Sequence, residues 1–271
     1  MTQQAKKHQP IGVFDSGIGG LTVANAIIRH LPNEKIIYFG DTAHLPYGDK
    51  SADAIRYYCL KIAKFLLSKD CKMIVVACNS ASSAAYKDLL DFFAGQTLFV
   101  NVVDPLVKAV AQYPFKKIGV IATKATIRSG IYQSKLEAQE ANLKVAALAT
   151  PLLVPMIEEG YFQNNISQAI IHNYLANEQL ADIEALLLAC THYPLIRKDI
   201  EQYFDHQVKV LDSNQVVAQE VKKKLAAAQL LSDLKTGQHQ FFVSDYTKSF
   251  EETTQIFYQK TIDLEYLPIW S

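Results

Sequence analysis

The sequence predicts an α/β protein with two pseudo-symmetric domains, each a mainly parallel sheet flanked by helices. Three observations predict this class. The chain has 271 residues, more than one ordinary hydrophobic core needs, so two domains are expected. Short apolar runs alternate with longer helix-like stretches, which is typical of parallel sheets covered on both faces. A similar pattern of strand and polar motif also occurs twice along the chain.

The expected strands are short and apolar on both faces. In chain order they are Ile11–Asp15, Lys35–Gly40, Met73–Cys78, Thr97–Val103, Lys117–Thr123, Lys144–Thr150, Glu184–Cys190, Val208–Asp212 and Gln240–Ser244. Helix-like stretches separate most of them, for example Leu21–Leu31, Ala52–Leu67 and Asn214–Ala228.

The two halves of the chain resemble each other weakly. The letters IGV open one predicted strand at 11–13 and another at 118–120. The first half later contains VVACNS, and the second contains LLACTH. If these halves are duplicated units that pack face to face, Cys78 and Cys190 occupy mirror-like positions. Chance recurrence of short apolar motifs is the alternative.

Composition favours a soluble globular protein. Apolar residues make up 49% of the chain, and 27 Lys plus Arg balance 27 Asp plus Glu. A neutral chain disfavours binding to nucleic acid or a membrane surface, which usually needs a basic excess. The sequence contains no apolar stretch of about 18 residues, and the start MTQQAKKHQP contains no apolar signal region. We therefore expect a cytoplasmic protein with unpaired cysteines and a small-molecule ligand.

Cys78 and Cys190 are the main candidates for chemistry. Each ends a predicted strand, precedes hydroxyl or amide side chains, and is expected to begin a helix, whose N-terminus lowers a thiol's pKa. A thiol titrating near working pH can take and give a proton. Two facing thiols suit a racemase, which removes an α-proton on one face and delivers a proton to the other. The alternative for each is a small buried hydrophobe; we expect Cys59 to be core and assign Cys71 no role.

Other polar residues follow predicted strands, where parallel sheets bind ligands. Asp15 is a candidate to orient Cys78 or share its proton, and His192 to tune Cys190. The alternatives are a turn or capping carboxylate and a hydrogen-bonded histidine at a helix start. The glycines at 17, 19 and 20 let backbone N–H groups approach a small ligand. Hydroxyls suited to binding carboxylates are those of Ser16, Ser80, Thr123, Thr126 and Thr191.

Several other functional classes fit less well. A dinucleotide loop of the form G-x-G-x-x-G would need glycine at position 22, which is Thr22, although Asp41 follows the second strand where a ribose-binding acid lies. The chain has no C-x-x-C pair, so a zinc site is not expected. Cysteine-protease chemistry needs one thiol and does not explain a second equivalent cysteine.

Six motifs in order resemble the glutamate racemases of the aspartate/glutamate racemase superfamily, from about Ile11 to at least Ser213. They are GVFDSGIGGLTV, YFGDTAHLPYG, VVACNSASS, GVIATKATI, PLLVPMIEEG and ACTHYPLI. The resemblance implies interconversion of L- and D-glutamate without pyridoxal phosphate or metal, for peptidoglycan synthesis. It implies an active site in the cleft between two domains, which we place at residues 1–103 plus 213–271 and at residues 104–212. The family often dimerises, so a homodimer is compatible with it.

The resemblance also implies roles for individual residues. Cys78 would be the base that acts on D-glutamate and Cys190 the base that acts on L-glutamate. Asp15 and His192 would assist them, and Glu158 would contribute near the second thiol. The substrate's carboxylates and amino group would be held, beside these residues, by Ser16, Pro46, Tyr47, Gly48, Asn79, Ser80, Thr123, Thr126 and Thr191.

The sequence departs from the family at a few positions. Ser80 stands where Thr is usual, Thr150 where many members have Cys, and Ala122 and Ala125 where Gly is common. None of these changes removes a proposed catalytic group. Two alternatives stay open: an aspartate racemase, whose substrate is one methylene shorter, a difference of about 1–3 kcal/mol in a pocket, and a non-catalytic binding protein.

Overall fold

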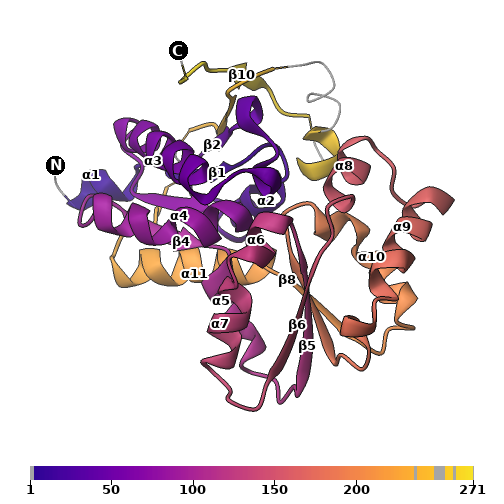
Figure 1. Ribbon diagram of the computed structural model, residues 1–271. Coiled ribbons are helices and arrows are strands. Elements are labelled where there is room, and N and C mark those ends of the chain that lie inside the picture. Colours follow the sequence, from indigo (N-terminus) through magenta and orange to yellow (C-terminus); the bar gives the residue numbers. More distant parts are fainter. Residues whose placement is uncertain (1–2, 235–236, 247–253, 259–260, 271) are drawn as a thin grey trace.

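The structure is a computed structural model that describes residues 3–234, 237–246, 254–258 and 261–270. Two parallel sheets flanked by helices form two domains (Figure 1). The predicted fold class is therefore confirmed. All nine predicted strands are present, with ends that differ by at most two residues from the prediction.

The first sheet has six strands in the order β10-β9-β2-β1-β3-β4, and its neighbouring strands run parallel. The short strand β10 was not predicted. The bounds are β1 (Ile11–Asp15), β2 (Ile36–Gly40), β3 (Met73–Val76), β4 (Leu98–Asn101), β9 (Gln240–Val243) and β10 (Leu264–Tyr266).

The second sheet has four parallel strands in the order β6-β5-β7-β8. Its strands follow one another in the sequence, between the first sheet's β4 and β9, so the chain crosses between the sheets twice. The domain boundaries after residues 103 and 212 stay a prediction. The bounds are β5 (Lys117–Ala122), β6 (Lys144–Ala149), β7 (Ala185–Ala189) and β8 (Lys209–Asp212).

Helices cover the sheets, and the three predicted examples are present within one residue at each end. The α-helices are α1 (Gln3–Lys7), α2 (Leu21–His30), α3 (Ala52–Ser68), α4 (Asn79–Phe92), α5 (Val103–Val110), α6 (Lys124–Arg128), α7 (Ile131–Glu137), α8 (Leu153–Glu158), α9 (Asn165–Leu175), α10 (Arg197–Tyr203) and α11 (Asn214–Ala227). Short 3-10 helices are η1 (Thr42–His44), η2 (Tyr47–Asp49), η3 (Glu178–Leu180) and η4 (Tyr193–Ile196), and residues 254–258 are also helical.

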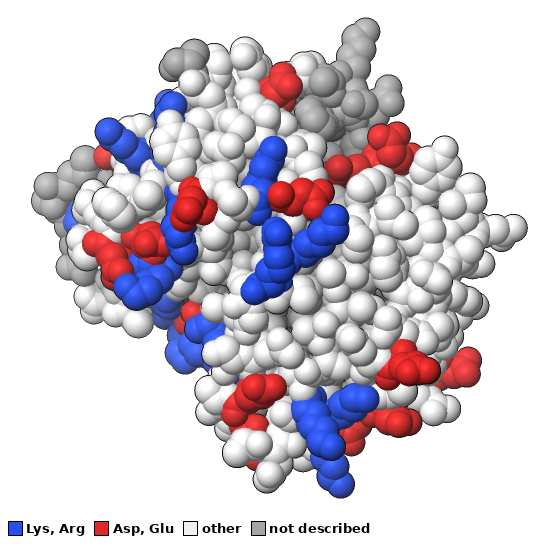
Figure 2. Space-filling view, viewed as in Figure 1, with Lys and Arg blue, Asp and Glu red and all other residues white. Residues whose placement is uncertain are grey.

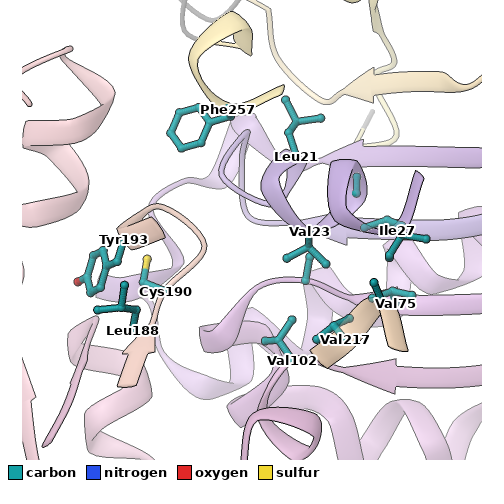
Figure 3. Packing of buried hydrophobic residues seen from close by; sticks show 14 of the residues in the cluster. Leu21, Val23, Ile27, Val75, Val102, Leu188, Cys190, Tyr193, Val217 and Phe257 are labelled. Carbon is teal, nitrogen blue, oxygen red and sulfur yellow. The ribbon is translucent and has the colours of Figure 1, made fainter. Parts of the chain in front are cut away.

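One large hydrophobic cluster joins the two domains. Val23 of α2, Val75 of β3 and Val217 of α11 belong to it, and so do Leu188 of β7 and Tyr193 (Figure 3). Strands β1, β2, β3 and β7 are buried along their whole length. They therefore need apolar residues on both faces, which explains why they read as continuous apolar runs in the sequence.

The register of the strands sets the positions of the polar residues that follow them. Phe14 of β1 lies opposite Val76 of β3, and Ala122 of β5 lies opposite Ala189 of β7. Because the strands are parallel, the polar residues after each pair meet at one edge of their sheet.

Side chains stiffen both crossings between the sheets. Asn101 Oδ1 accepts hydrogen bonds from the amides of Val103 and Asp104, each at 2.8 Å. Asp212 Oδ1 accepts one from the amide of Asn214 at 2.9 Å. In each case a side-chain oxygen fixes the chain where it leaves a strand and enters a helix.

The surface carries both signs of charge. In Figure 2, Lys and Arg side chains are interspersed with Asp and Glu on the visible face. Among the helices of the described residues, none is both long and apolar enough to cross a membrane.

Candidate active site

A pocket between the two sheets brings most of the predicted site residues together. Its walls come from the loops that follow β1, β2 and β3 of the first sheet and β5, β6 and β7 of the second. The lining residues are Ser16, Pro46, Tyr47, Gly48, Asp49, Cys78, Asn79, Ser80, Thr123, Lys124, Thr150, Pro151, Val154, Pro155, Cys190, Thr191 and His192.

Cys78 caps the N-terminus of α4. Its sulfur accepts a hydrogen bond from the amide of Ala81 at 3.4 Å and lies 3.7 Å from Ser16 Oγ. Burial, and then the nearby carboxylate of Asp15, raise the pKa of Cys78 to about 12, although the Ala81 amide and Ser16 lower it. We expected the helix N-terminus to lower this pKa. The net direction is the opposite, because loss of hydration outweighs one N–H group.

Asp15 ends β1 beneath the loop that carries Ser16 and is fully buried. Its Oδ2 accepts hydrogen bonds from the amides of Gly17 at 3.3 Å and Gly20 at 3.0 Å, whereas its Oδ1 has no partner in the described part of the chain. Burial raises the pKa of Asp15, while the charge of His192 and the loop amides oppose that shift. Asp15 is thus a buried group next to Cys78 with one oxygen available to accept a proton or a hydrogen bond.

Cys190 follows β7, but it does not begin an α-helix as we predicted. A turn at Thr191 and His192 comes first, then η4, and α10 begins only at Arg197. The Cys190 sulfur lies 3.7 Å from His192 Nδ1. Figure 3 shows it at the edge of the hydrophobic cluster beside Tyr193. A histidine, rather than a helix N-terminus, is therefore the polar partner of the second thiol.

His192 links Cys190 to a carboxylate. Its Nε2 lies 2.9 Å from Oε1 of Glu158, at the end of α8, and its Nδ1 faces the Cys190 sulfur. Burial alone would lower the pKa of His192, but the hydrogen bonds to Cys190 and Glu158 raise it to about 10. His192 is therefore an imidazolium at neutral pH, and it stabilises negative charge that develops on the sulfur.

The loop after β1 touches the loop after β7 through a glycine. A Cβ atom on Gly19 would lie 2.4 Å from His192 Cε1 and 2.6 Å from Thr191 Oγ1. Only glycine allows this approach. On the other side, the ring of Phe257 meets the His192 ring edge to face at 5.0 Å. Sequence reasoning missed Phe257, because nothing near it in the sequence relates it to His192.

Hydroxyl and amide groups from both domains form one polar cluster. Ser80 Oγ lies 2.9 Å from Thr123 Oγ1, which lies 3.2 Å from Thr126 Oγ1. Asn79 Oδ1 accepts a hydrogen bond from the hydroxyl of Tyr132 at 2.7 Å, and this bond orients the amide. Its buried Nδ2 has no partner in the described residues. These donors suit a carboxylate, which only accepts hydrogen bonds.

The turn formed by Pro46, Tyr47 and Gly48 closes one side of the pocket. A Cβ on Gly48 would lie 2.9 Å from Thr123 Cβ, so this turn of the first domain touches the second. The hydroxyl of Tyr47 donates to Asp41 Oδ2 at 2.6 Å and does not serve as a free donor for a ligand. Asp41 is fully buried, which contradicts its reading as a ribose-binding acid.

The segment after β6 also lines the pocket and was missed. The rule that ligands bind beyond strand ends would have found it, because the predicted strand Lys144–Thr150 ends there. Also missed was an ion pair between Lys124 Nζ and Asp49 Oδ1, 3.2 Å apart and about half exposed, which joins the two domains at the pocket. The missed lining residues after β6 are Thr150, Pro151, Val154 and Pro155.

The remaining cysteines lie elsewhere. Cys59 is buried in α3 and Cys71 is buried before β3. All four cysteines are unpaired. Within the described ranges, no group of three or more His, Cys, Asp or Glu side chains is placed to hold a metal ion.

Comparisons with known proteins agree with this arrangement. The family model for Asp/Glu/Hydantoin racemase matches residues 12–221. The chain is 41% identical to a glutamate racemase of Geobacter metallireducens over 89% of both chains, and 38% identical to one of Chlorobium phaeobacteroides over 98% of both. A crystal structure of glutamate racemase from Francisella tularensis in complex with D-glutamate superposes with a TM-score of 0.92, at 35% identity, over 97% of this chain and 99% of that one. These three similar proteins are glutamate racemases, and the chain belongs to the Asp/Glu/hydantoin racemase family.

Proposed function

We propose that this protein racemises glutamate by a two-base mechanism in which Cys78 and Cys190 act on opposite faces of the α-carbon. One observation carries the proposal: two thiols from different sheets line one pocket, and each has its own acid–base partner. Asp15 lies next to Cys78, and His192 next to Cys190. A binding site has no use for such a pair, whereas a proton transfer that can run in both directions needs it.

The ionisation of the site favours one starting state. Cys78 is a protonated thiol, because burial raises its pKa to about 12. The imidazolium of His192 lies 3.7 Å from the Cys190 sulfur, where it stabilises negative charge that develops during proton transfer. In this state Cys190 removes the α-proton of L-glutamate, and Cys78 delivers its own proton to the opposite face to give D-glutamate. The reverse reaction exchanges these roles. The Cys78 thiol passes its proton to the free oxygen of the Asp15 carboxylate, whose pKa burial raises. The resulting thiolate removes the α-proton of D-glutamate, and the Cys190 thiol delivers its proton to the opposite face.

Deprotonation places negative charge beside a carboxylate, so the site must stabilise it as it develops. The amide of Asn79 and the hydroxyls of Ser80 and Thr123 are fixed by contacts within the protein before the substrate arrives. Donors fixed in advance need no reorganisation during the reaction, which is why they are effective in a site closed to water.

The first test is turnover in heavy water. Metal-chelated protein without pyridoxal phosphate is incubated with L-glutamate, while circular dichroism follows optical activity and proton NMR follows the α-hydrogen. We expect optical activity to decay to zero as deuterium enters the α-position. Racemisation of aspartate in place of glutamate would assign the enzyme to the aspartate branch, and no exchange with either would refute an enzyme of this kind.

The second test removes each thiol. Cys78→Ala and Cys190→Ala should each lower the racemisation rate by at least about 10³-fold, since general acid–base groups contribute about 10²–10⁴-fold. Cys71→Ala is the matched control, because Cys71 is buried and lies before β3. Substantial activity in either of the first two variants would refute the two-base assignment.

The proposal includes a cytoplasmic enzyme, able to form a homodimer, that supplies D-glutamate for peptidoglycan. Cells that lack the gene should grow only when D-glutamate is added to the medium. Growth without that addition, in cells with no second enzyme of this activity, would contradict the proposed role.

A further inference from the structure

The fully buried carboxylate of Asp41 joins three separate segments of the chain: its own loop after β2, Ser244 after β9 and Trp270 after β10. His44 Nδ1 lies 3.0 Å from its Oδ2, and the hydroxyl of Tyr47 donates to the same oxygen at 2.6 Å. Ser244 Oγ and Trp270 Nε1 each donate to Oδ1 at 2.8 Å. A carboxylate offers about four acceptor sites. The four donors therefore satisfy it, and each bond is strengthened by its charge.

The indole of Trp270 is held by its neighbours as well as by Asp41. It meets the ring of His44 edge to face at 4.5 Å and that of Tyr58 at 5.3 Å, and Lys61 Nζ lies 5.0 Å from its centre. These contacts fix the ring so that its N–H points at the carboxylate. Trp270 thereby ties the segment after β10 to the loop after β2.

The same carboxylate fixes a wall of the pocket. Tyr47 is almost fully buried and lines the pocket together with Pro46 and Gly48. The turn is closed by hydrogen bonds from the amide of Asp49 to the carbonyl of Pro46 at 3.4 Å and from the amide of Lys50 to that of Tyr47 at 3.2 Å. The bond from Tyr47 to Asp41 anchors this turn to the body of the first domain.

We propose that Asp41 and Trp270 are positioning residues of the active site, which hold the turn Pro46–Gly48 where it contacts the substrate. Both act through Tyr47. The turn contacts the substrate and the transition state alike, so its displacement weakens the binding of both to the same extent. Such a loss raises KM and leaves kcat nearly unchanged. The kinetic part of this inference rests on the proposed racemisation, whereas the structural part does not.

Two variants and a control test the proposal. Asp41→Asn keeps the shape of the side chain but replaces one acceptor oxygen by a donor. Trp270→Phe keeps an aromatic ring and removes the N–H, which provides a second variant if the first fails to fold. Tyr57→Phe is the control, since the ring of Tyr57, in α3, lies 6.3 Å from that of Trp270 and the residue is 60% exposed.

We expect Asp41→Asn to raise KM for both enantiomers about tenfold, which corresponds to about 1.4 kcal/mol of binding free energy, with a smaller rise for Trp270→Phe and none for the control. Trp270 is the only tryptophan, so its fluorescence should change in Asp41→Asn. A fall in kcat with unchanged KM in both variants would overturn the proposal, because a general loss of folded protein acts in that way.

Hydrogen exchange provides a test that does not depend on turnover. The amides of Asp49 and Lys50 should exchange faster in both variants than in the wild type or the Tyr57→Phe control. Unchanged exchange would overturn the inference even if the enzyme racemises glutamate. If the wild type does not racemise glutamate, the proposed function fails, and the exchange rates still decide whether Asp41 and Trp270 hold the turn.

Discussion

Glu158→Gln removes the charge of the carboxylate that lies 2.9 Å from His192 Nε2, while it keeps the size of the side chain. The bond to Glu158 is one of two that raise the pKa of His192 to about 10 against the effect of burial. The imidazolium of the variant must therefore lose its proton at a lower pH. Because the imidazolium stabilises negative charge that develops on the Cys190 sulfur, activity should fall at a lower alkaline pH than in the wild type.

The size of the shift follows from the strength of the lost bond. A hydrogen bond to a charged group contributes about 1.5–3 kcal/mol, and one pKa unit corresponds to about 1.4 kcal/mol. The Glu158 side chain is 26% exposed, so solvent screening favours the lower end of that range. We expect the pKa of His192 to fall by about one unit. His192 then stays protonated at pH 7, and only the alkaline limb of the plot of kcat/KM against pH moves.

The assay is kcat/KM for both enantiomers across the alkaline range, which reports the ionisation of the free enzyme. The two enantiomers are equally stable in solution, so kcat/KM must shift by the same amount in both directions. This equality is an internal check on the data. Glu159→Gln is the matched control, because Glu159 is the exposed neighbour in the sequence. An alkaline limb at the same pH in both variants would refute the role given to Glu158.

Two further substitutions test the contacts between the domains. Gly19→Ala would place a carbon 2.4 Å from His192 Cε1 and should lower kcat/KM by about 100-fold. Gly17→Ala is the control and should have a far smaller effect, because its added carbon meets no described atom nearer than 3.6 Å. Equal losses in the two variants would contradict this steric explanation, and thermal unfolding will separate loss of activity from loss of folding. Lys124→Gln breaks the exposed ion pair with Asp49. It should raise KM by no more than about fivefold, since such pairs contribute about 0–1 kcal/mol. The difference in KM from wild type should vanish in about 1 M salt, and a difference that persists would mean that Lys124 contacts the substrate directly.

Local sequence was sufficient for nine of the strands and for placing the two thiols just after strand ends. A strand buried on both faces must be apolar throughout, so β1, β3 and β7 are visible as runs that end at polar residues. The motifs around Cys78 and Cys190 follow such runs. The strand β10 has no such pattern, because it is three residues long and mostly exposed.

Three features depended on the assembled structure. The high pKa of Cys78 arises because the fold buries the thiol beside Asp15, and no local motif records that loss of hydration. The segment that follows Cys190 contains Pro194 in the first turn of its helix. Proline is compatible there with both an α-helix and the 3-10 helix that forms, so the sequence could not distinguish the two. The hydrogen bond between Asp41 and Trp270 spans 229 positions, so neither residue is informative without the fold.

The double crossing between the sheets restricts how the pocket can open. Two chain segments join the domains side by side, because α5 and α11, which follow the two crossings, are in contact. A single connection would allow the domains to twist and swing freely, whereas two leave one easy motion, a bend about the line that joins them. A bend about that line would separate residues paired across the pocket, such as Ser80 and Thr123, at the same time. Entry of either enantiomer and release of its product would then use the same movement of the two domains.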